Sequence, residues 1–134
     1  MIVLHEVALS PFAQKVKIAL REKSIEFDIQ IADLGGSDAE FAKISPRTEV
    51  PALVDGDLAI FDSAIILGYL DDKYPSPALM PADPAERARA RIIDMVCDTQ
   101  VAAVTWAITD VLVFQRARGD FGNTHPPAPP PHLS

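Results

Sequence analysis

The sequence predicts an α/β domain with the element order β-α-β-α-β-β-α, followed by an incomplete all-α segment. Three observations support this prediction. An amphipathic helical pattern at 11–23 lies between two strand-like runs, an Asp55-Gly56 pair separates two short apolar runs, and prolines between 75 and 84 precede a long apolar helical pattern. A strand–helix–strand unit joined to a hairpin and a further helix gives a mixed four-stranded sheet with helices on both faces.

The first half of the predicted domain begins with a strand at 1–7, where apolar and β-branched residues predominate. A helix at 11–23 follows, because Ser10 is a good N-cap and Pro11 suits the first helical position. Its apolar and charged residues lie mostly on opposite faces, with Phe12, Val16, Ala19 and Leu20 on one and Lys15, Lys17, Arg21, Glu22 and Lys23 on the other. Alternation at 26–31 predicts a second strand with one apolar side, formed by Phe27, Ile29 and Ile31.

The second half of the predicted domain contains a short helix at 37–44 and a hairpin. The hairpin strands at 51–54 and 58–61 are joined around Asp55-Gly56, which is a strong turn signal. A helix at 62–74 completes the order, and four prolines after it exclude regular helix and act as a linker.

The later part of the chain is predicted to be helical from Asp83-Pro84 to about 118. Between 101 and 114 the apolar positions nearly surround this helix, so it needs partners on several sides. The last nine residues contain five prolines, which predicts disorder. We therefore divide the chain into a domain at 1–80, a linker and helix at 81–118, and a proline-rich tail at 119–134.

The composition excludes several classes of protein. The chain has 134 residues, is 49% hydrophobic and carries a formal net charge of −7, which argues against binding to nucleic acid. A single cysteine, Cys97, excludes an intrachain disulfide and favours a reducing compartment, the cytoplasm. No signal-peptide pattern opens the sequence, and Asp94, Asp98 and Asp110 argue against a membrane span at 92–114. The sequence also lacks a metal-ligand spacing.

Three segments together resemble the cytosolic glutathione transferases, close to their bacterial and omega-like branches. Residues 10–23 resemble the first helix of that family, and residues 49–53 and 61–66 resemble its glutathione-binding strand and helix. Residues 1–80 match in order and spacing, which implies a thioredoxin-like amino-terminal domain. Residues 84–118 resemble the first long helix of the family's helical second domain. The chain therefore resembles a truncated or frame-altered member.

The resemblance implies that Ser10 is the catalytic residue. A free thiol has a pKa of about 8.5, so a catalyst must favour the thiolate of glutathione. The Ser10 hydroxyl could donate a hydrogen bond to the sulfur, and the start of the helix adds partial positive charge there. Local sequence alone favours the alternative that Ser10 only caps the helix. The omega-like branch carries Cys at this position, so Ser here excludes a mixed disulfide at Ser10.

The resemblance also names the other candidate glutathione contacts, which include Phe12 in the first helix. The Val50-Pro51 bond is cis in the family, which exposes the backbone of Val50 for pairing with the ligand like an added strand. Ser63 and its helix start would bind the γ-glutamyl carboxylate, with Asp62 near the ammonium group of the ligand. Each of these residues also has a purely structural alternative, since Pro51 suits the start of an edge strand and Asp62 or Ser63 can simply cap a helix.

The loop after the second strand departs from the family pattern, because it holds three acids and no base. Lys43 or Arg47 would then have to reach the glycyl carboxylate, and a weak glycyl contact is expected. The function implied is a glutathione transferase that activates glutathione, its co-substrate, toward an unknown small electrophile. The alternatives are a non-catalytic regulatory or protein-binding member of the same scaffold and an inactive remnant. A homodimer or another self-associated form is also expected.

Overall fold

A mixed four-stranded sheet in the order β2-β1-β3-β4 forms the centre of the first of two compact units, Met1–Ala82 and Asp83–Ser134. The computed structural model describes residues 1–112. Strand β1 pairs in parallel with β2 and antiparallel with β3, and β3 pairs antiparallel with β4. The parallel pair needs a crossover, which is supplied by α1. The strands are β1 (Ile2–Glu6), β2 (Phe27–Ile31), β3 (Ala52–Asp55) and β4 (Leu58–Phe61).

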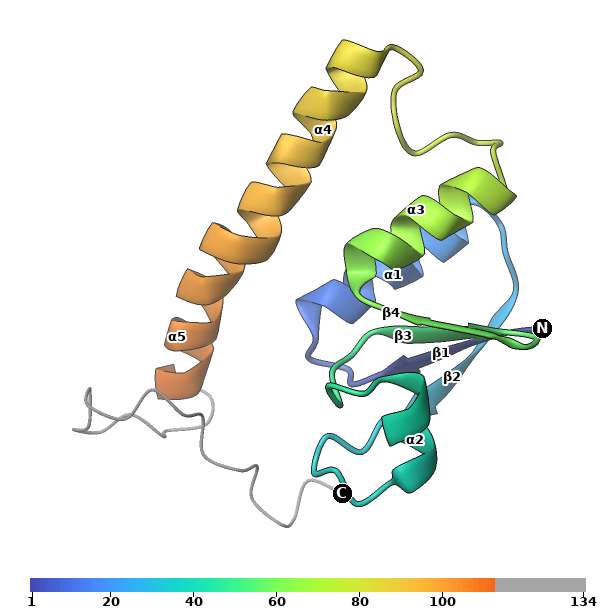
Figure 1. Ribbon diagram of the computed structural model, residues 1–134. Helices are drawn as coiled ribbons and strands as arrows, with labels where there is room; N and C mark the ends of the chain where they lie inside the picture. The colour runs from blue at the N-terminus through green and yellow to red at the C-terminus, as the bar shows by residue number, and fades with distance from the viewer. Residues whose placement is uncertain (113–134) are drawn as a thin grey trace. The chain divides into compact units, whose positions relative to one another are not determined.

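Helices cover both faces of this sheet. Figure 1 shows α1 and α3 together on one face and the short α2 on the other. The bounds of the helices are Pro11–Glu22 for α1, Ala39–Ile44 for α2 and Ser63–Lys73 for α3. The predicted thioredoxin-like order of elements is thus confirmed, with ends that differ by one or two residues.

Two apolar clusters hold the layers together. The larger cluster joins β1 and β3 to α1 and α3, and the smaller one fixes α2 on the opposite face. The larger contains Ile2, Leu4, Val16, Ala19, Leu20, Leu53, Ile66 and Leu70, and the smaller contains Ala32, Phe41 and Ala52. Each fully buried Val, Leu, Ile or Phe side chain contributes roughly 1.5–3 kcal/mol, so burial on both faces fixes the register of the sheet.

Two lysines that the helical pattern places on the polar face of α1 are buried. Lys17 and Lys23 are each 7% exposed. The ammonium group of Lys23 donates to Asp71 Oδ1 and to the carbonyl oxygens of Tyr74 and Pro77, at 2.8, 2.6 and 2.7 Å. The prediction was wrong for these lysines because their acceptors come from segments that a local pattern does not include.

The β3–β4 turn agrees with its sequence signal. Gly56 has φ +61°, a conformation that costs glycine little. Beside it, the carboxylate of Asp55 pairs with the ammonium group of Lys73 and accepts a hydrogen bond of 2.8 Å from the Tyr69 hydroxyl. The Lys73 and Tyr69 hydrogen bonds hold the pKa of Asp55 below its usual range. The turn is thereby fastened to α3.

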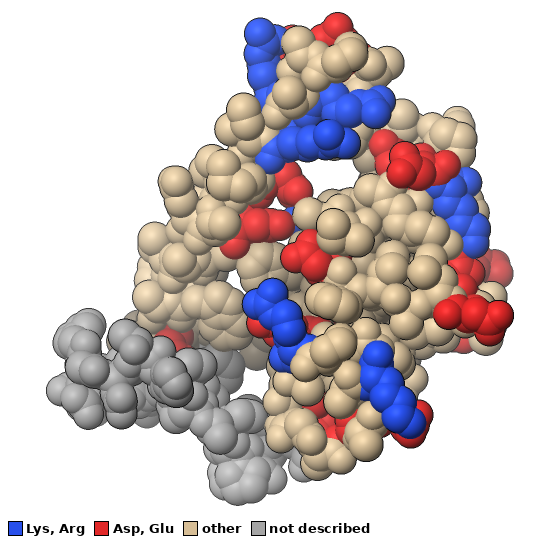
Figure 2. All heavy atoms as spheres, viewed as in Figure 1, with Lys and Arg blue, Asp and Glu red and all other residues tan. Residues whose placement is uncertain are grey.

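The described part of the second unit, residues 83–112, is a helical rod. It begins at the Asp83 cap and contains α4 (Pro84–Val96), a π-helical segment η1 (Cys97–Val101) and α5 (Ala102–Leu112). The predicted extension to 118 and the predicted disorder of 119–134 lie outside the described residues. Figure 2 shows basic side chains gathered over the first turns of α4 and few charged side chains over α5.

Large apolar side chains are exposed along this rod. Their exposed fractions range from 46% for Trp106 to 72% for Leu112. By length and composition, the 29 residues Pro84–Leu112 could cross a membrane, but the core helix of a soluble protein passes the same test. Asp94, Asp98 and Asp110 lie within these 29 residues.

Candidate functional site

The register of three strands brings three of the candidate site segments to one end of the sheet. His5 of β1 lies opposite Ala52 of β3, and Ala52 lies opposite Phe61 of β4. The chain beyond this row leads from β1 to Ser10, from β3 back to Val50-Pro51, and from β4 to Asp62-Ser63. The antiparallel order of β1, β3 and β4 therefore gathers three segments that are distant in sequence.

Ser10 is a buried N-cap. Its Oγ accepts a hydrogen bond from the amide of Ala13 at 3.2 Å, its own amide donates to Val7, and Pro11 occupies the first helical turn. The local reading of Ser10 as a cap is confirmed. A hydroxyl that accepts from the backbone still has one proton to donate, so capping is compatible with a hydrogen bond to a ligand. Phe12 lies half-buried in the same turn.

The Val50-Pro51 bond is cis, as the resemblance implied. Val50 packs against the cluster around Phe41 under α2, and Pro51 is buried. The turn before Val50 is held by Ser45, whose fully buried hydroxyl donates to the carbonyl of Glu49 at 2.9 Å and accepts from its amide at 3.2 Å. Sequence reasoning missed Ser45, although a serine before a proline is a known signal for such a turn.

Asp62 and Ser63 form the start of α3. The exposed Asp62 caps the helix, since its Oδ1 accepts hydrogen bonds from the amides of Ala64 and Ile65 at 2.9 and 3.3 Å. Its φ of +76° is rare for a residue other than glycine, and such strained backbone clusters at functional sites. Ser63 is 4% exposed. Asp62 therefore performs the capping role that the local reading left open between these two residues.

Lys43 and Arg47 are exposed, and each pairs with a neighbouring acid. The ammonium group of Lys43 lies 2.6 Å from Glu40 Oε1, and the guanidinium of Arg47 lies 3.0 Å from Glu49 Oε1. In the loop before α2, the carboxylate of Asp33 accepts hydrogen bonds from Ser37 and from the amide of Gly35, which lower its pKa. A ligand carboxylate near this loop would meet bases that are already partly neutralised.

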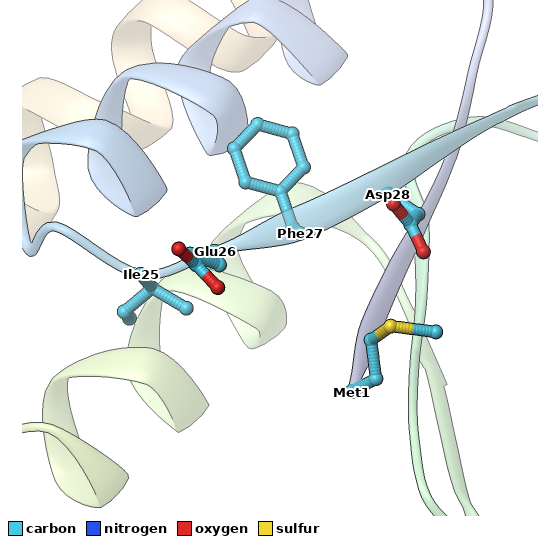
Figure 3. A pocket seen from close by; sticks show the side chains of 5 residues that line it. All are labelled: Met1, Ile25, Glu26, Phe27 and Asp28. Carbon is cyan, nitrogen blue, oxygen red and sulfur yellow. The ribbon is translucent and has the colours of Figure 1, made fainter.

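A surface hollow lies at the other end of β1. It has a volume of about 450 Å³ and is lined by Met1, Ile25, Glu26, Phe27 and Asp28. Figure 3 shows the phenyl ring of Phe27 and the carboxylates of Glu26 and Asp28 around it. None of the candidate site residues lines this hollow. Within residues 1–112, no group of three or more His, Cys, Asp or Glu side chains is arranged to hold a metal ion.

Comparison with protein families identifies the scaffold. The family described as "Glutathione S-transferase, N-terminal domain" matches residues 4–78, which is more than half of the chain and includes all three gathered segments. The chain belongs to the glutathione S-transferase family. The resemblance stated from the sequence is confirmed.

Two curated relatives show the range of this family. Glutathione S-transferase Z2 of Arabidopsis thaliana is 50% identical over 88 residues, which cover 63% of this chain and 40% of the relative. A stringent starvation protein A homolog of Coxiella burnetii is 34% identical over 90 residues, covering 67% of this chain and 43% of the relative. The chain thus spans about 40% of the length of the curated relatives that it matches.

A solved glutathione S-transferase from Methylobacterium radiotolerans, in complex with glutathione sulfonate, is similar over a longer region. It is 30% identical, with a TM-score of 0.75, and the match covers 93% of this chain and 57% of that chain. Since the first unit ends at Ala82, the match extends into the helical rod. The rod of this glutathione S-transferase chain therefore has a counterpart in a solved family member.

Proposed function

We propose that the first unit of this glutathione S-transferase chain binds glutathione at the strand ends and activates its thiol for transfer to a small electrophile. The observation that carries the proposal is the register His5–Ala52–Phe61, which gathers Ser10, Val50-Pro51 and Asp62-Ser63. The glutathione sulfonate complex of the similar Methylobacterium protein supports the same ligand class.

Each gathered segment has a role in this proposal. The backbone of Val50 pairs with the cysteinyl part of glutathione, which brings the sulfur toward Ser10. The Ser10 hydroxyl donates to the sulfur, and the first amides of α1 favour its negative charge, so the pKa of the bound thiol falls. Ser63 and the start of α3 bind the γ-glutamyl carboxylate, while the Asp62 carboxylate attracts the adjacent ammonium group. The Phe12 side chain packs beside the thiol of glutathione, and the ammonium group of Lys43 attracts the glycyl carboxylate weakly.

Calorimetric titration with glutathione tests the binding part of the proposal. Ser63→Ala should weaken binding about tenfold, because a hydrogen bond to a charged group contributes about 1.5 kcal/mol or more. Ser24→Gly is the matched control, since this exposed serine has φ 54° and lies beside Ile25, near the opposite end of β1. Circular dichroism of each variant establishes that it is folded. Absence of binding by the wild-type chain at millimolar glutathione would contradict the proposal.

Thiolate absorbance in the ultraviolet, followed against pH, tests the activation part. Ser10→Ala should bind glutathione but require a higher pH to ionise its thiol. Transfer to an activated aryl halide then shows whether the chain also turns over. If the thiol of bound glutathione ionises at the same pH in the wild type and in Ser10→Ala, Ser10 is only a cap.

A non-catalytic regulatory role on the same scaffold is the second candidate. It is supported by the similarity to the stringent starvation protein A homolog, a relative that is not named as a transferase. Glutathione binding without transfer would support this role or that of an inactive remnant. For either function we infer the cytoplasm, where a reduced Cys97, exposed and free in the structure, would persist.

A further inference from the structure

A buried ion pair spans the segment that carries Ser10. Glu6 is the last residue of β1, and Lys17 lies in the second turn of α1. The Lys17 Nζ lies 2.6 Å from Glu6 Oε2, and the side chains are 9% and 5% exposed. In sequence, the pair encloses the turn from Val7 to Ser10 and the first turn of α1.

Stability alone does not account for charges at these positions. Burying an ionised group costs several kcal/mol, and replacing a buried ion pair by apolar residues of similar size is often neutral or stabilising. Within residues 1–112, the Lys17 ammonium group is the cation in contact with Glu6 Oε2, and no other hydrogen-bond donor reaches that buried oxygen. Such a pair is weak evidence for stabilisation, but it favours one relative position of its two partners.

The Glu6–Lys17 pair favours one position of α1 along β1. The contacts of Val16, Ala19 and Leu20 with the sheet are apolar and therefore non-directional. The hydrogen bonds of the Ser10 turn include short-range ones, from the Ser10 amide to Val7 O and from Gln14 Nε2 to Ala8 O, both at 2.9 Å. Glu6 is itself anchored, because its carbonyl accepts the amide of Ala32 at 2.9 Å.

We propose that Glu6 and Lys17 are positioning residues for Ser10. By fixing the start of α1 against the end of β1, they hold the Ser10 hydroxyl and the first helical amides where the thiol of glutathione would lie. This inference rests on the proposed function. On this inference, the buried Glu6–Lys17 pair influences the ionisation of the thiol without touching the ligand.

The test compares a charge-free pair with the native one. In Glu6→Leu/Lys17→Met the apolar side chains remove the buried charges, so the fold and thermal stability should be kept even where Lys17→Met alone fails to fold. We expect this double variant to bind glutathione at low pH as the wild type does, but to raise the pKa of the bound thiol by about one unit, a tenfold loss of thiolate at a given pH. Lys17→Arg should keep the native pKa.

A second readout does not need the ligand. The amide of Ala13 donates to Ser10 Oγ, so its hydrogen exchange reports whether the cap is in place. In the double variant this exchange should be about tenfold faster, while that of amides later in α1 is unchanged. Native thiol ionisation and native Ala13 exchange in a stable double variant would overturn the inference. If the wild type does not bind glutathione, the proposed function fails, and Ala13 exchange alone decides the positioning role.

Discussion

The ammonium group of Lys23 donates a hydrogen bond of 2.8 Å to the carboxylate of Asp71, 48 residues away in sequence. Lys23 caps the end of α1, and Asp71 lies in the last turn of α3. Asp71 also accepts the amide of Leu79 at 2.9 Å, so the pair fastens the segment after α3 to both helices. Burial opposes ionisation of Asp71, but its hydrogen bonds with Lys23 and Leu79 outweigh this and lower its pKa.

Replacing Lys23 should destabilise the first unit strongly. Lys23→Met leaves a half-buried carboxylate without its cation and two carbonyls without their donor, so we expect a loss of about 3 kcal/mol in the free energy of unfolding. Chemical denaturation measures this loss. Lys43→Met, which breaks an exposed pair with Glu40, is the control and should change little. Equal effects of the two substitutions would show that the buried contacts of Lys23 do not matter.

The stability of the first unit should fall below neutral pH because of His5. This ring is 4% exposed and stacks on Phe41 with a centroid distance of 5.5 Å. Burial lowers the pKa of His5 from its ordinary 6.5, against the opposing charge of Asp38. The unfolded chain then takes up the proton at a higher pH than the folded chain. The contribution of His5 to stability is therefore complete above pH 6.5, and it is lost as the pH falls toward the pKa of His5 in the folded chain.

His5→Phe isolates this contribution, because phenylalanine keeps the stacked ring and cannot titrate. The difference in unfolding free energy between wild type and variant should change with pH below 6.5 and be constant above it. Other titrating groups cancel in this difference. A difference that does not depend on pH would mean that the histidine is not buried in solution.

Binding of the glycyl carboxylate of glutathione should depend weakly on Lys43. Lys43→Ala should reduce the affinity for glutathione by roughly two- to fivefold, the usual size of an exposed charge interaction. Glu40→Gln should raise the affinity, because it removes the carboxylate that pairs with the Lys43 ammonium group. Calorimetry at low salt gives both values. If neither variant changes the affinity, the glycyl carboxylate lies elsewhere.

The helical rod should make the chain self-associate. Val104 and Ile108 are one helical turn apart and are 62% and 52% exposed, and contiguous apolar surface of this kind is usually covered. Val104→Lys/Ile108→Lys should shift sedimentation toward the monomer, whereas Ala103→Lys should shift it less. A wild-type chain that is monomeric at micromolar concentration would contradict this prediction.

Local signals were sufficient for the elements of the first unit. Ser10-Pro11 marked a helix start and Asp55-Gly56 a turn, because each depends on the conformational preferences of one or two residues. The burial of Lys17 and Lys23 was not predictable in this way, since their partners come from β1 and α3. The cis bond at Ser76-Pro77 was missed, because the two isomers of such a bond differ by only about 0.5–1 kcal/mol in a local peptide.

The candidate site was predictable only through the family resemblance. Locally, Asp62 is a cap and Ser10 is a cap, and the structure confirms both roles. Their convergence depends on strand register, which follows from the burial of both faces of the sheet rather than from any motif. The exposure of Ile29 and Ile31 on β2 has a similar origin, because β2 is an edge strand whose pattern does not show how much of it is covered.

The β3–β4 hairpin places its turn and the candidate site segments at opposite ends of its two strands. Its turn at Gly56 lies at one end of the two strands, and the residues that flank the hairpin, Pro51 and Asp62, lie at the other. A longer turn, an inserted tag or an attached fluorophore at Gly56 would thus be remote from the gathered segments. Changes at the turn leave the gathered segments in place as long as Asp55 keeps its contacts with Lys73 and Tyr69. A single inserted residue within either strand would displace one segment relative to the others.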